Sequence, residues 1–317
     1  MELNTRNITQ LIEDFLWHCR FEKNLDMKTI KAYQTDLKQF SRQCEDNGKI
    51  EDINKHEIKS YLQRLSSFEY KTIKRKLATL RAMLNYCECE YEDFVNPMRK
   101  MQIRLREPIR LPKVMTIEEV TKIFKYQRSE LHLSEPQSYK HILCVRNIAI
   151  LELLFASGIR IGELCNLRNK DIDLSNGVLH ILGKGNKERI IYICQSQTLD
   201  ALISWNNQKH QKACVNDYFF TNRLNRPLST QSVRLMLHQV AKLAHINKTI
   251  TPHMFRHTFA TLLLEEDVDI KYIQSLLGHS SIVTTQIYTH VNPYKQKEIL
   301  ITKHPRRLIT IEQEYYK

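Results

Sequence analysis

The sequence predicts a mainly α-helical protein with one small β-hairpin, an α+β architecture of two domains. With 317 residues, the chain is long enough for two domains that each bury a core. Apolar residues recur at helical spacing through residues 1–98, whereas strand-like alternation is confined to Val178–Ile193. The chain has no strand–helix alternation, no GxGxxG and no Walker motif, which argues against a doubly wound nucleotide-binding fold.

The first predicted domain, residues 1–98, contains four apolar stripes with the spacing of amphipathic helices. They are Ile8, Leu11, Ile12, Phe15 and Cys19; Ile30, Tyr33, Leu37 and Phe40; Ile58, Tyr61, Leu62 and Leu65; and Ile73, Leu77, Leu80 and Leu84. We expect Gly48 to follow the end of the second helix and Asn96-Pro97 to end the fourth. The pattern predicts a compact helical domain.

The charge of the chain favours a polyanionic partner. The formal net charge is +13, and the basic residues are spread along the whole sequence rather than gathered in a tail. Basic globular proteins of this kind most often bind nucleic acid, because phosphate contacts release counterions, and the alternative is a basic protein that is merely soluble. On the fourth helix, Lys71, Lys74 and Arg75 are accompanied by Lys76 and Arg81 and by almost no acid. This predicts a phosphate-facing surface, although an ordinary solvated face has the same pattern.

Residues 99–113 are predicted to form a basic linker between the domains. Six basic side chains stand against one acid, and Pro108 and Pro112 interrupt any helix. The basic residues are Arg99, Lys100, Arg104, Arg106, Arg110 and Lys113. The linker either runs along a DNA backbone, with Arg104 and Arg110 in contact with it, or is simply solvated.

The second predicted domain, residues 114–317, opens on a capping box at Thr116–Glu119. An apolar helix is expected over Ile142–Ala156 and is stopped at Gly158. A hairpin over Val178–Ile193 follows, and the chain is mostly helical from Ser196 onward. The stretch Pro293–Leu300 predicts a C-terminal helix.

The eight cysteines form no C-x-x-C pair and lie mainly in apolar stretches, so free thiols in a reducing cytosol are expected. No apolar run approaches the ~20 residues that span a membrane. The polar N-terminus lacks a signal-peptide core. We therefore expect a cytoplasmic, nucleoid-associated protein with no metal site.

Three local motifs in the second domain suggest phosphate chemistry. In Ser157–Leu164, Arg160 follows a glycine and Glu163 is placed to hold its guanidinium, although such a pair is usually a structural salt bridge. In Gly183–Arg189, Lys184 lies between two glycines at a hairpin tip, where a solvated turn is the ordinary alternative.

The third motif lies at the start of a predicted helix. His253, Arg256 and His257 fall on one helical face behind a proline. The two histidines have the spacing of a metal pair, but no HExxH glutamate follows His253, and Arg256 would repel a cation. Phosphate binding therefore fits better than a metal site.

A fourth motif is more specific than these three. It runs through Leu276-Leu277-Gly278-His279-Ser280-Ser281 and Thr284–Val291, with Tyr288 and His290 at its end. This string resembles the tyrosine recombinase (phage-integrase) family in its bacterial Xer-like branch. The preceding motifs match in the same order, so the resemblance covers the second domain. The helical first domain looks like the family's SAM-like core-binding domain.

The resemblance implies a two-domain DNA clamp and assigns roles by position. It implies Tyr288 as nucleophile, Arg160 and Arg256 as the clamp on the scissile phosphate, and Lys184 as general acid. It implies an acid–base role for His253 and a phosphate hydrogen bond for His279, with Glu163 and His257 supporting. Gly162 departs from the small polar residue that relatives often carry there. Rival tyrosines lie outside the motif: Tyr272, Tyr294, Tyr315 and Tyr316.

These roles imply a site-specific recombinase that cuts and rejoins DNA through a 3′-phosphotyrosyl link without cofactor or metal. The implied partners are double-stranded DNA with a specific core site and a homotetramer, or a related recombinase, and an accessory directionality protein is compatible. The C-terminal helix is implied to dock on a neighbouring protomer, unless it packs on its own domain. Alternatives are a DNA-binding regulator that lost cleavage and a type IB topoisomerase. Dimer resolution, integration and excision, or inversion all remain open as outcomes.

Overall fold

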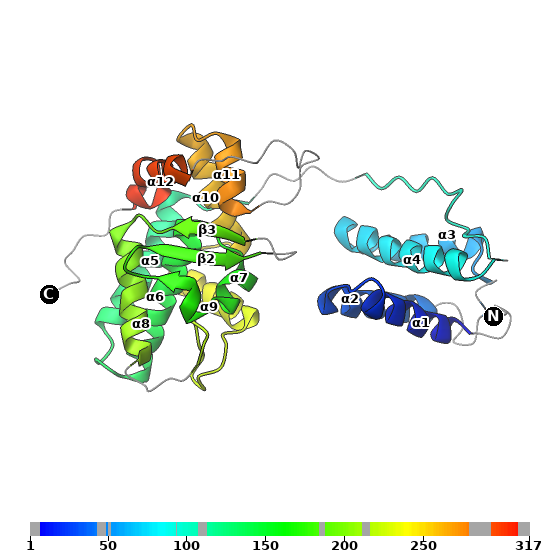
Figure 1. Ribbon diagram of the computed structural model, residues 1–317, viewed down its shortest axis with the longest axis horizontal. Helices are drawn as coiled ribbons and strands as arrows, with labels where there is room; N and C mark the ends of the chain where they lie inside the picture. The colour runs from blue at the N-terminus through cyan, green and yellow to red at the C-terminus, as the bar shows by residue number, and fades with distance from the viewer. Residues whose placement is uncertain are drawn as a thin grey trace. The chain divides into compact units, whose positions relative to one another are not determined.

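The computed structural model describes residues 7–42, 49, 52–92, 94–106, 113–183, 188–210, 216–278 and 293–309. The chain divides into two compact units, Met1–Arg110 and Leu111–Lys317, and each is treated by itself (Figure 1). This division falls inside the predicted basic linker. The described structure is mainly helical with one small antiparallel sheet, which confirms the predicted fold class.

The N-terminal unit is built from helices with buried apolar stripes and polar N-caps. The helices are α1 (Ile8–Phe21), α2 (Met27–Ser41), α3 (Lys55–Leu65) and α4 (Tyr70–Glu90). Asn7, Asp26 and Asn54 cap the first three helices by accepting from backbone N–H groups. The predicted apolar stripes pack into one hydrophobic core, which confirms the prediction of a helical domain. Helix α4 ends at Glu90, six residues before the Asn96 that we expected to mark its end.

A buried carboxylate joins α2 to α4. Asp36 is 1% exposed and accepts from Arg75, from Lys76 Nζ at 3.2 Å and from Thr79 Oγ1 at 3.2 Å. Lys76, which also donates to Gln39, is itself buried, so it does not belong to the outer basic face. Lys71, Lys74 and Arg81 are exposed on α4, as is Arg75 in spite of its ion pair.

The second unit is organised around helix α6. Its elements are α5 (Ile117–His132), α6 (Tyr139–Ser157), α7 (Ile161–Asn166), η3 (Asn169–Asp171), β1 (Ile172–Asp173), β2 (Val178–Leu182), β3 (Glu188–Tyr192), α8 (Ser196–His210), α9 (Thr230–Leu243), α10 (Pro252–Glu265), α11 (Ile270–Leu277), α12 (Pro293–Thr302) and η4 (Pro305–Leu308). The apolar residues of α6 pack against α5, α8 and α10, and every residue of Ile148–Ser157 is buried. The capping box at Thr116 and the stop at Gly158 are confirmed.

The sheet lies beside this helical core (Figure 1). Strands β2 and β3 pair antiparallel, with Leu179 opposite Ile191 and Leu182 opposite Glu188. The predicted hairpin is confirmed, and the short β1 adds a third strand that the alternation pattern did not reveal. The pairing brings residue 183 and residue 188 to the same end of the sheet.

A second buried carboxylate holds the C-terminal end of the described chain. Glu152 on α6 is fully buried, and Arg306 of η4 donates to it through Nε at 2.8 Å and Nη2 at 3.0 Å. Arg128 of α5 and Thr198 of α8 donate to the same carboxylate. The neighbouring His304 donates from Nε2 to Ala156 O at 2.7 Å, because its Nδ1 accepts from the Arg306 backbone N–H. These contacts join four elements at one point in the core.

Helix α12 packs on its own unit. Ile299 and Leu300 are buried in a cluster with Phe259, Leu263 and other apolar side chains of α10 and α11. Tyr294 and Ile301 on α12 are 85% and 53% exposed. No helix among the described residues is long and apolar enough to cross a membrane.

Candidate functional site

The site begins where α6 ends. Gly158 adopts φ 56°, a left-handed conformation that ends the helix. A Cβ there would lie 2.8 Å from Leu277 Cδ2 and 2.9 Å from Phe259 Cδ1. The absence of a side chain therefore lets the end of α6 lie against α10 and α11, and this brings Arg160 beside the C-terminal end of α11.

Arg160 and Glu163 form a closed local pair. The Arg160 backbone N–H donates to Glu163 Oε2 at 3.0 Å, and Arg160 Nη1 donates to Oε1 at 2.8 Å. The remaining Nη2 donates to Gly278 O at 2.6 Å. The side chain of Arg160 stays 32% exposed, whereas that of Glu163 is only 8% exposed. The guanidinium is thus fixed on its inner side and open on the other.

Arg256 projects from the first turns of α10. Thr251 caps this helix, Pro252 is its first residue, and His253 and His257 lie on the same face as Arg256. Arg256 is 6% exposed and donates to Gly158 O at 2.8 Å and to Leu277 O at 2.6 Å. Burial, and then the charges of Arg160 and Arg189, lower the pKa of Arg256 to about 10. The side chain remains a cation at neutral pH.

A third guanidinium belongs to the cluster and was missing from the predicted site residues. Arg189 of β3 makes two parallel bonds to Glu163, Nη1 to Oε1 at 3.0 Å and Nη2 to Oε2 at 2.7 Å. Its Nε donates to Leu276 O at 3.2 Å. The only sequence signal was its place as the last letter of the GKGNKER motif. Arg189 therefore ties the hairpin strand to both Glu163 and α11.

The three arginines share one backbone anchor. The consecutive carbonyls of Leu276, Leu277 and Gly278 accept from Arg189, Arg256 and Arg160 respectively. The carbonyls at the C-terminal end of a helix carry partial negative charge, so they hold cations without neutralising them. Three guanidiniums against the single carboxylate of Glu163 leave a net positive site. Such a site can bind a phosphate and stabilise charge that develops on it.

The two histidines of α10 are more exposed than Arg256, although they share its face of the helix. His253 and His257 are both exposed. Partial burial, followed by the charges of His257, Arg256, Arg234 and Arg160, lowers the pKa of His253. His253 is therefore neutral at pH 7 and has one ring nitrogen able to accept a proton.

Several predicted site residues lie outside the described residues, namely Lys184, His279, Tyr288, His290 and Arg110. Lys71, Lys74, Arg75 and Arg104 belong to the N-terminal unit, where all four are exposed. Within the described ranges, no group of three His, Cys, Asp or Glu side chains is arranged to hold a metal ion.

Two family models match the sequence. The model of the phage integrase family matches residues 113–295, and that of the phage integrase N-terminal SAM-like domain matches residues 12–90. The chain belongs to the phage integrase family of tyrosine recombinases. It is accordingly a site-specific recombinase, an enzyme that cleaves and rejoins DNA strands, with a SAM-like core-binding domain and a catalytic integrase domain. The predicted family, fold and reaction are confirmed.

Relatives match over nearly their full length. A tyrosine recombinase of Agathobacter rectalis is 44% identical over 302 residues, which cover 95% of this chain and 98% of the relative. Tyrosine recombinase XerD of Halalkalibacterium halodurans is 37% identical, with 93% and 97% covered. Tyrosine recombinase XerC of Leptospira interrogans is 34% identical, with 96% of each chain covered.

Solved structures share the fold at lower identity. XerH recombinase bound to palindromic difH substrate, a post-cleavage complex, matches with a TM-score of 0.69 and 22% identity over 92% of this chain and 83% of that chain. A lambda integrase tetramer bound to a Holliday junction matches with a TM-score of 0.67 and 20% identity over 89% and 80%. These structures support the assignment of the fold.

Proposed function

We propose that this recombinase cleaves a specific core site through Tyr288 and holds the scissile phosphate between Arg160 and Arg256. The observation that carries the proposal is the arginine cluster. Arg256 is buried and anchored only by neutral carbonyls among its described contacts, and the anchored Arg160 lies beside it with one side open. Guanidiniums supply fixed donors that keep their protons, which suits the charge of a pentacovalent phosphorus.

In the proposed reaction, the Tyr288 oxygen attacks the phosphorus and the bond to the 5′-oxygen breaks. The leaving 5′-oxygen takes a proton from Lys184, while the phenol proton passes to His253. Forming phenolate at pH 7 costs roughly 4 kcal/mol, because the reference pKa is near 10, and nearby cations offset much of this. The 3′-phosphotyrosyl link conserves the bond energy, so a 5′-hydroxyl from a second DNA end reverses the step without ATP.

The remaining residues support these roles. Glu163 keeps Arg160 oriented, and His279 donates to a phosphate oxygen. His257 is assigned a supporting part on the same face of α10 as Arg256. Cationic side chains replace a metal in this scheme, because the arginines supply the positive charge that a metal would otherwise bring.

We further propose that the substrate is double-stranded DNA in the cytoplasmic nucleoid, bound by a tetramer of this chain or by a pairing with a related recombinase. Lys71, Lys74, Arg75, Arg104 and Arg110 contact the DNA backbone. The net charge of +13 supports this assignment. The exposed side chains Tyr294 and Ile301 support a neighbour-facing surface on α12.

The proposal is tested with Tyr288→Phe on a nicked suicide substrate. We expect normal DNA binding in a mobility-shift assay and no covalent protein–DNA adduct, because the phenol oxygen is missing. The matched control is Tyr272→Phe, which should form the adduct at the wild-type rate. A covalent adduct formed by Tyr288→Phe would show that another residue is the nucleophile.

A second measurement separates recombination from topoisomerase action. A recombinase should join two sites on one plasmid and should relax supercoils only where its core site is present. Relaxation of any supercoiled plasmid, without joining of sites, would favour the topoisomerase alternative. Activity should survive chelation by EDTA.

A further inference from the structure

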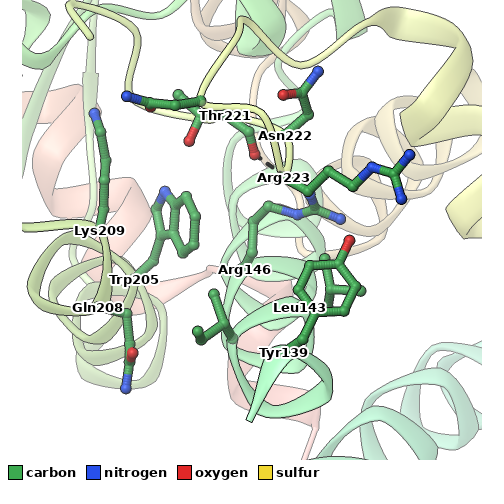
Figure 2. Close-up of a pocket in the computed structure, with 11 residues that line it drawn as sticks. Tyr139, Leu143, Arg146, Trp205, Gln208, Lys209, Thr221, Asn222 and Arg223 are labelled. Atoms are coloured by element: carbon green, nitrogen blue, oxygen red, sulfur yellow. Dashed lines mark hydrogen bonds between the residues drawn. The ribbon is translucent and has the colours of Figure 1, made fainter. Parts of the chain in front are cut away.

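A second positively charged feature lies away from the arginine cluster. It is a pocket of about 220 Å³ between the N-terminal half of α6, the C-terminal end of α8 and residues 221–225 (Figure 2). Tyr139, Leu143 and Trp205 give it apolar walls, and Arg146, Lys209 and Arg223 give it positive charge. Among the described residues that line the pocket, none is an acid.

Arg146 is the central cation of the pocket. Its Nη1 donates to Thr221 O at 3.3 Å, and its Nε and Nη2 donate to Asn147 Oδ1 at 3.3 and 3.0 Å. Figure 2 shows its guanidinium between the Tyr139 ring and the Arg223 side chain. Its described hydrogen-bond partners are all uncharged.

A comparison with other arginines of this unit shows why the uncharged partners of Arg146 matter. Arg128 and Arg306 both form ion pairs with Glu152, and Arg189 forms an ion pair with Glu163. Arg146 shares its pattern instead with Arg256, which is also bonded to neutral oxygens. Burial lowers the pKa of both. A partly buried cation that has no counter-ion among the described residues binds an anion more strongly than a cation that is already ion-paired.

The pocket is separate from the cleavage site. Gly158 lies twelve positions after Arg146 along α6 and its cap, which at 1.5 Å per residue is about 18 Å along the helix. A ligand of the size of this pocket would not reach the arginine cluster. The pocket therefore does not rest on the proposed roles of Arg160, Arg256 and Tyr288.

We propose that this pocket binds a small carboxylate whose apolar body lies against Tyr139, Leu143 and Trp205 and whose charged group pairs with Arg146. A planar carboxylate matches the two-donor fork of a guanidinium. Two further cations line the pocket: Arg223 lies at the exposed rim, and Lys209 donates to Asn169 Oδ1 at 2.7 Å. The apolar walls select against a bare inorganic anion, and the charge selects against a neutral molecule of the same shape.

The test uses a fluorophore that the chain already contains. The two tryptophans are Trp17, in the N-terminal unit, and Trp205, which lines the pocket. In full-length Trp17→Phe protein, the tryptophan emission reports on the pocket alone. We expect benzoate to change this emission saturably, and benzamide and inorganic phosphate to bind at least tenfold more weakly. A signal that does not saturate with benzoate, or equal binding of benzamide, would overturn the proposal.

Two variants in the same background locate the anion. Arg146→Lys keeps the charge but loses the fork, so we expect at least a tenfold weaker benzoate affinity. Arg223→Gln, at the exposed rim, should weaken it about twofold to fivefold through loss of a screened charge. Thermal unfolding checks that each variant is folded. Unchanged benzoate affinity in a folded Arg146→Lys protein would refute the assignment of the anion to Arg146. If Arg146→Lys fails to fold, the Arg223→Gln variant and the benzamide comparison still decide whether the pocket binds a carboxylate.

Discussion

Two glutamates of the second unit each hold two arginines, yet their surroundings differ. Glu152 is fully buried with Arg128 and Arg306, whose side chains are 10% and 1% exposed. Glu163 is nearly as buried, but one of its partners, Arg160, keeps 32% of its side chain exposed. The first group joins α5, α6, α8 and η4, whereas the second joins α7, β3 and the end of α11.

The comparison shows that the same chemistry serves two purposes. Around Glu152 the carboxylate and both guanidiniums lie almost entirely inside the core, so removal of the carboxylate leaves two cations buried without their counter-ion. Around Glu163 the exposed side of Arg160, with Arg256 beside it, leaves positive charge that a substrate can reach. We therefore expect removal of the Glu152 carboxylate to lower mainly the stability of the protein, and removal of the Glu163 carboxylate to slow mainly catalysis.

The largest expected effect is that of Glu152→Gln. Loss of the carboxylate leaves Arg128 and Arg306 without a counter-ion, which should lower the free energy of unfolding by about 3–5 kcal/mol. Urea unfolding followed by circular dichroism measures the change, with Glu163→Gln as the matched control. A loss below about 1 kcal/mol would mean that the buried network is not a stability element.

The free energy of unfolding should also depend on pH, because His304 lies beside the Glu152 network. Burial, followed by the charge of Arg306, holds the pKa of His304 down at about 4, against about 6.5 in the unfolded chain. The unfolded state therefore takes up a proton first as the pH falls from about 6.5 to 4. The contribution of His304 to the free energy of unfolding is complete above pH 6.5 and falls by about 3 kcal/mol between pH 6.5 and pH 4. Urea unfolding at several pH values should show a shallower fall for His304→Asn than for the wild type.

Glu163→Gln should act chiefly on cleavage. Burial raises the pKa of Glu163, but hydrogen bonds and charges from Arg189 and Arg160 outweigh this and leave the pKa lowered, so the group is ionised at neutral pH. The amide keeps the shape but loses the charge that orients Arg160. We expect cleavage of a suicide substrate to slow by about 10- to 100-fold, roughly 1.4–2.7 kcal/mol. If Glu163→Gln instead lost several kcal/mol of stability but cleaved normally when folded, Glu163 would have the stabilising role that we assign to Glu152.

The smallest effect is expected beside Arg160. Gly162 lies in α7, and an added Cβ would meet nothing within 4 Å. Gly162→Ala should therefore raise the free energy of unfolding by about 0.5–1 kcal/mol and leave cleavage unchanged. The control is Gly158→Ala, which should be destabilising because of its positive φ and its contact with Leu277. Slower cleavage by Gly162→Ala would show that this turn must move during the reaction.

Local spacing was enough to predict some of these features. The stripe and stop of α6, the hairpin over β2 and β3 and the shared face of His253 and Arg256 all follow from patterns within a few residues. The Arg160–Glu163 contact, three residues apart, belongs to the same class. Such contacts are set by helix and turn geometry, which the sequence displays directly.

Long-range partners could not be predicted in this way. Nothing near Arg189 shows that Glu163, 26 residues away, will receive it, and nothing near Lys76 shows that Asp36 will draw it into the core. The carbonyl acceptors of the arginines belong to the backbone, so they leave no mark in the sequence at all. Only the packing of α6, α10 and α11 brings them together.

The last turn of α11 therefore works as one anchor for three cations. Since its acceptors are main-chain atoms, exchanging the side chains of Leu276 or Leu277 for others that pack equally well would leave the hydrogen bonds from the arginines intact. Bending the backbone there would release all three arginines together, an all-or-none loss of the electropositive site. Gly278 is the vulnerable position of this turn, because its φ of 63° and its closeness to Arg189 leave little tolerance for another residue.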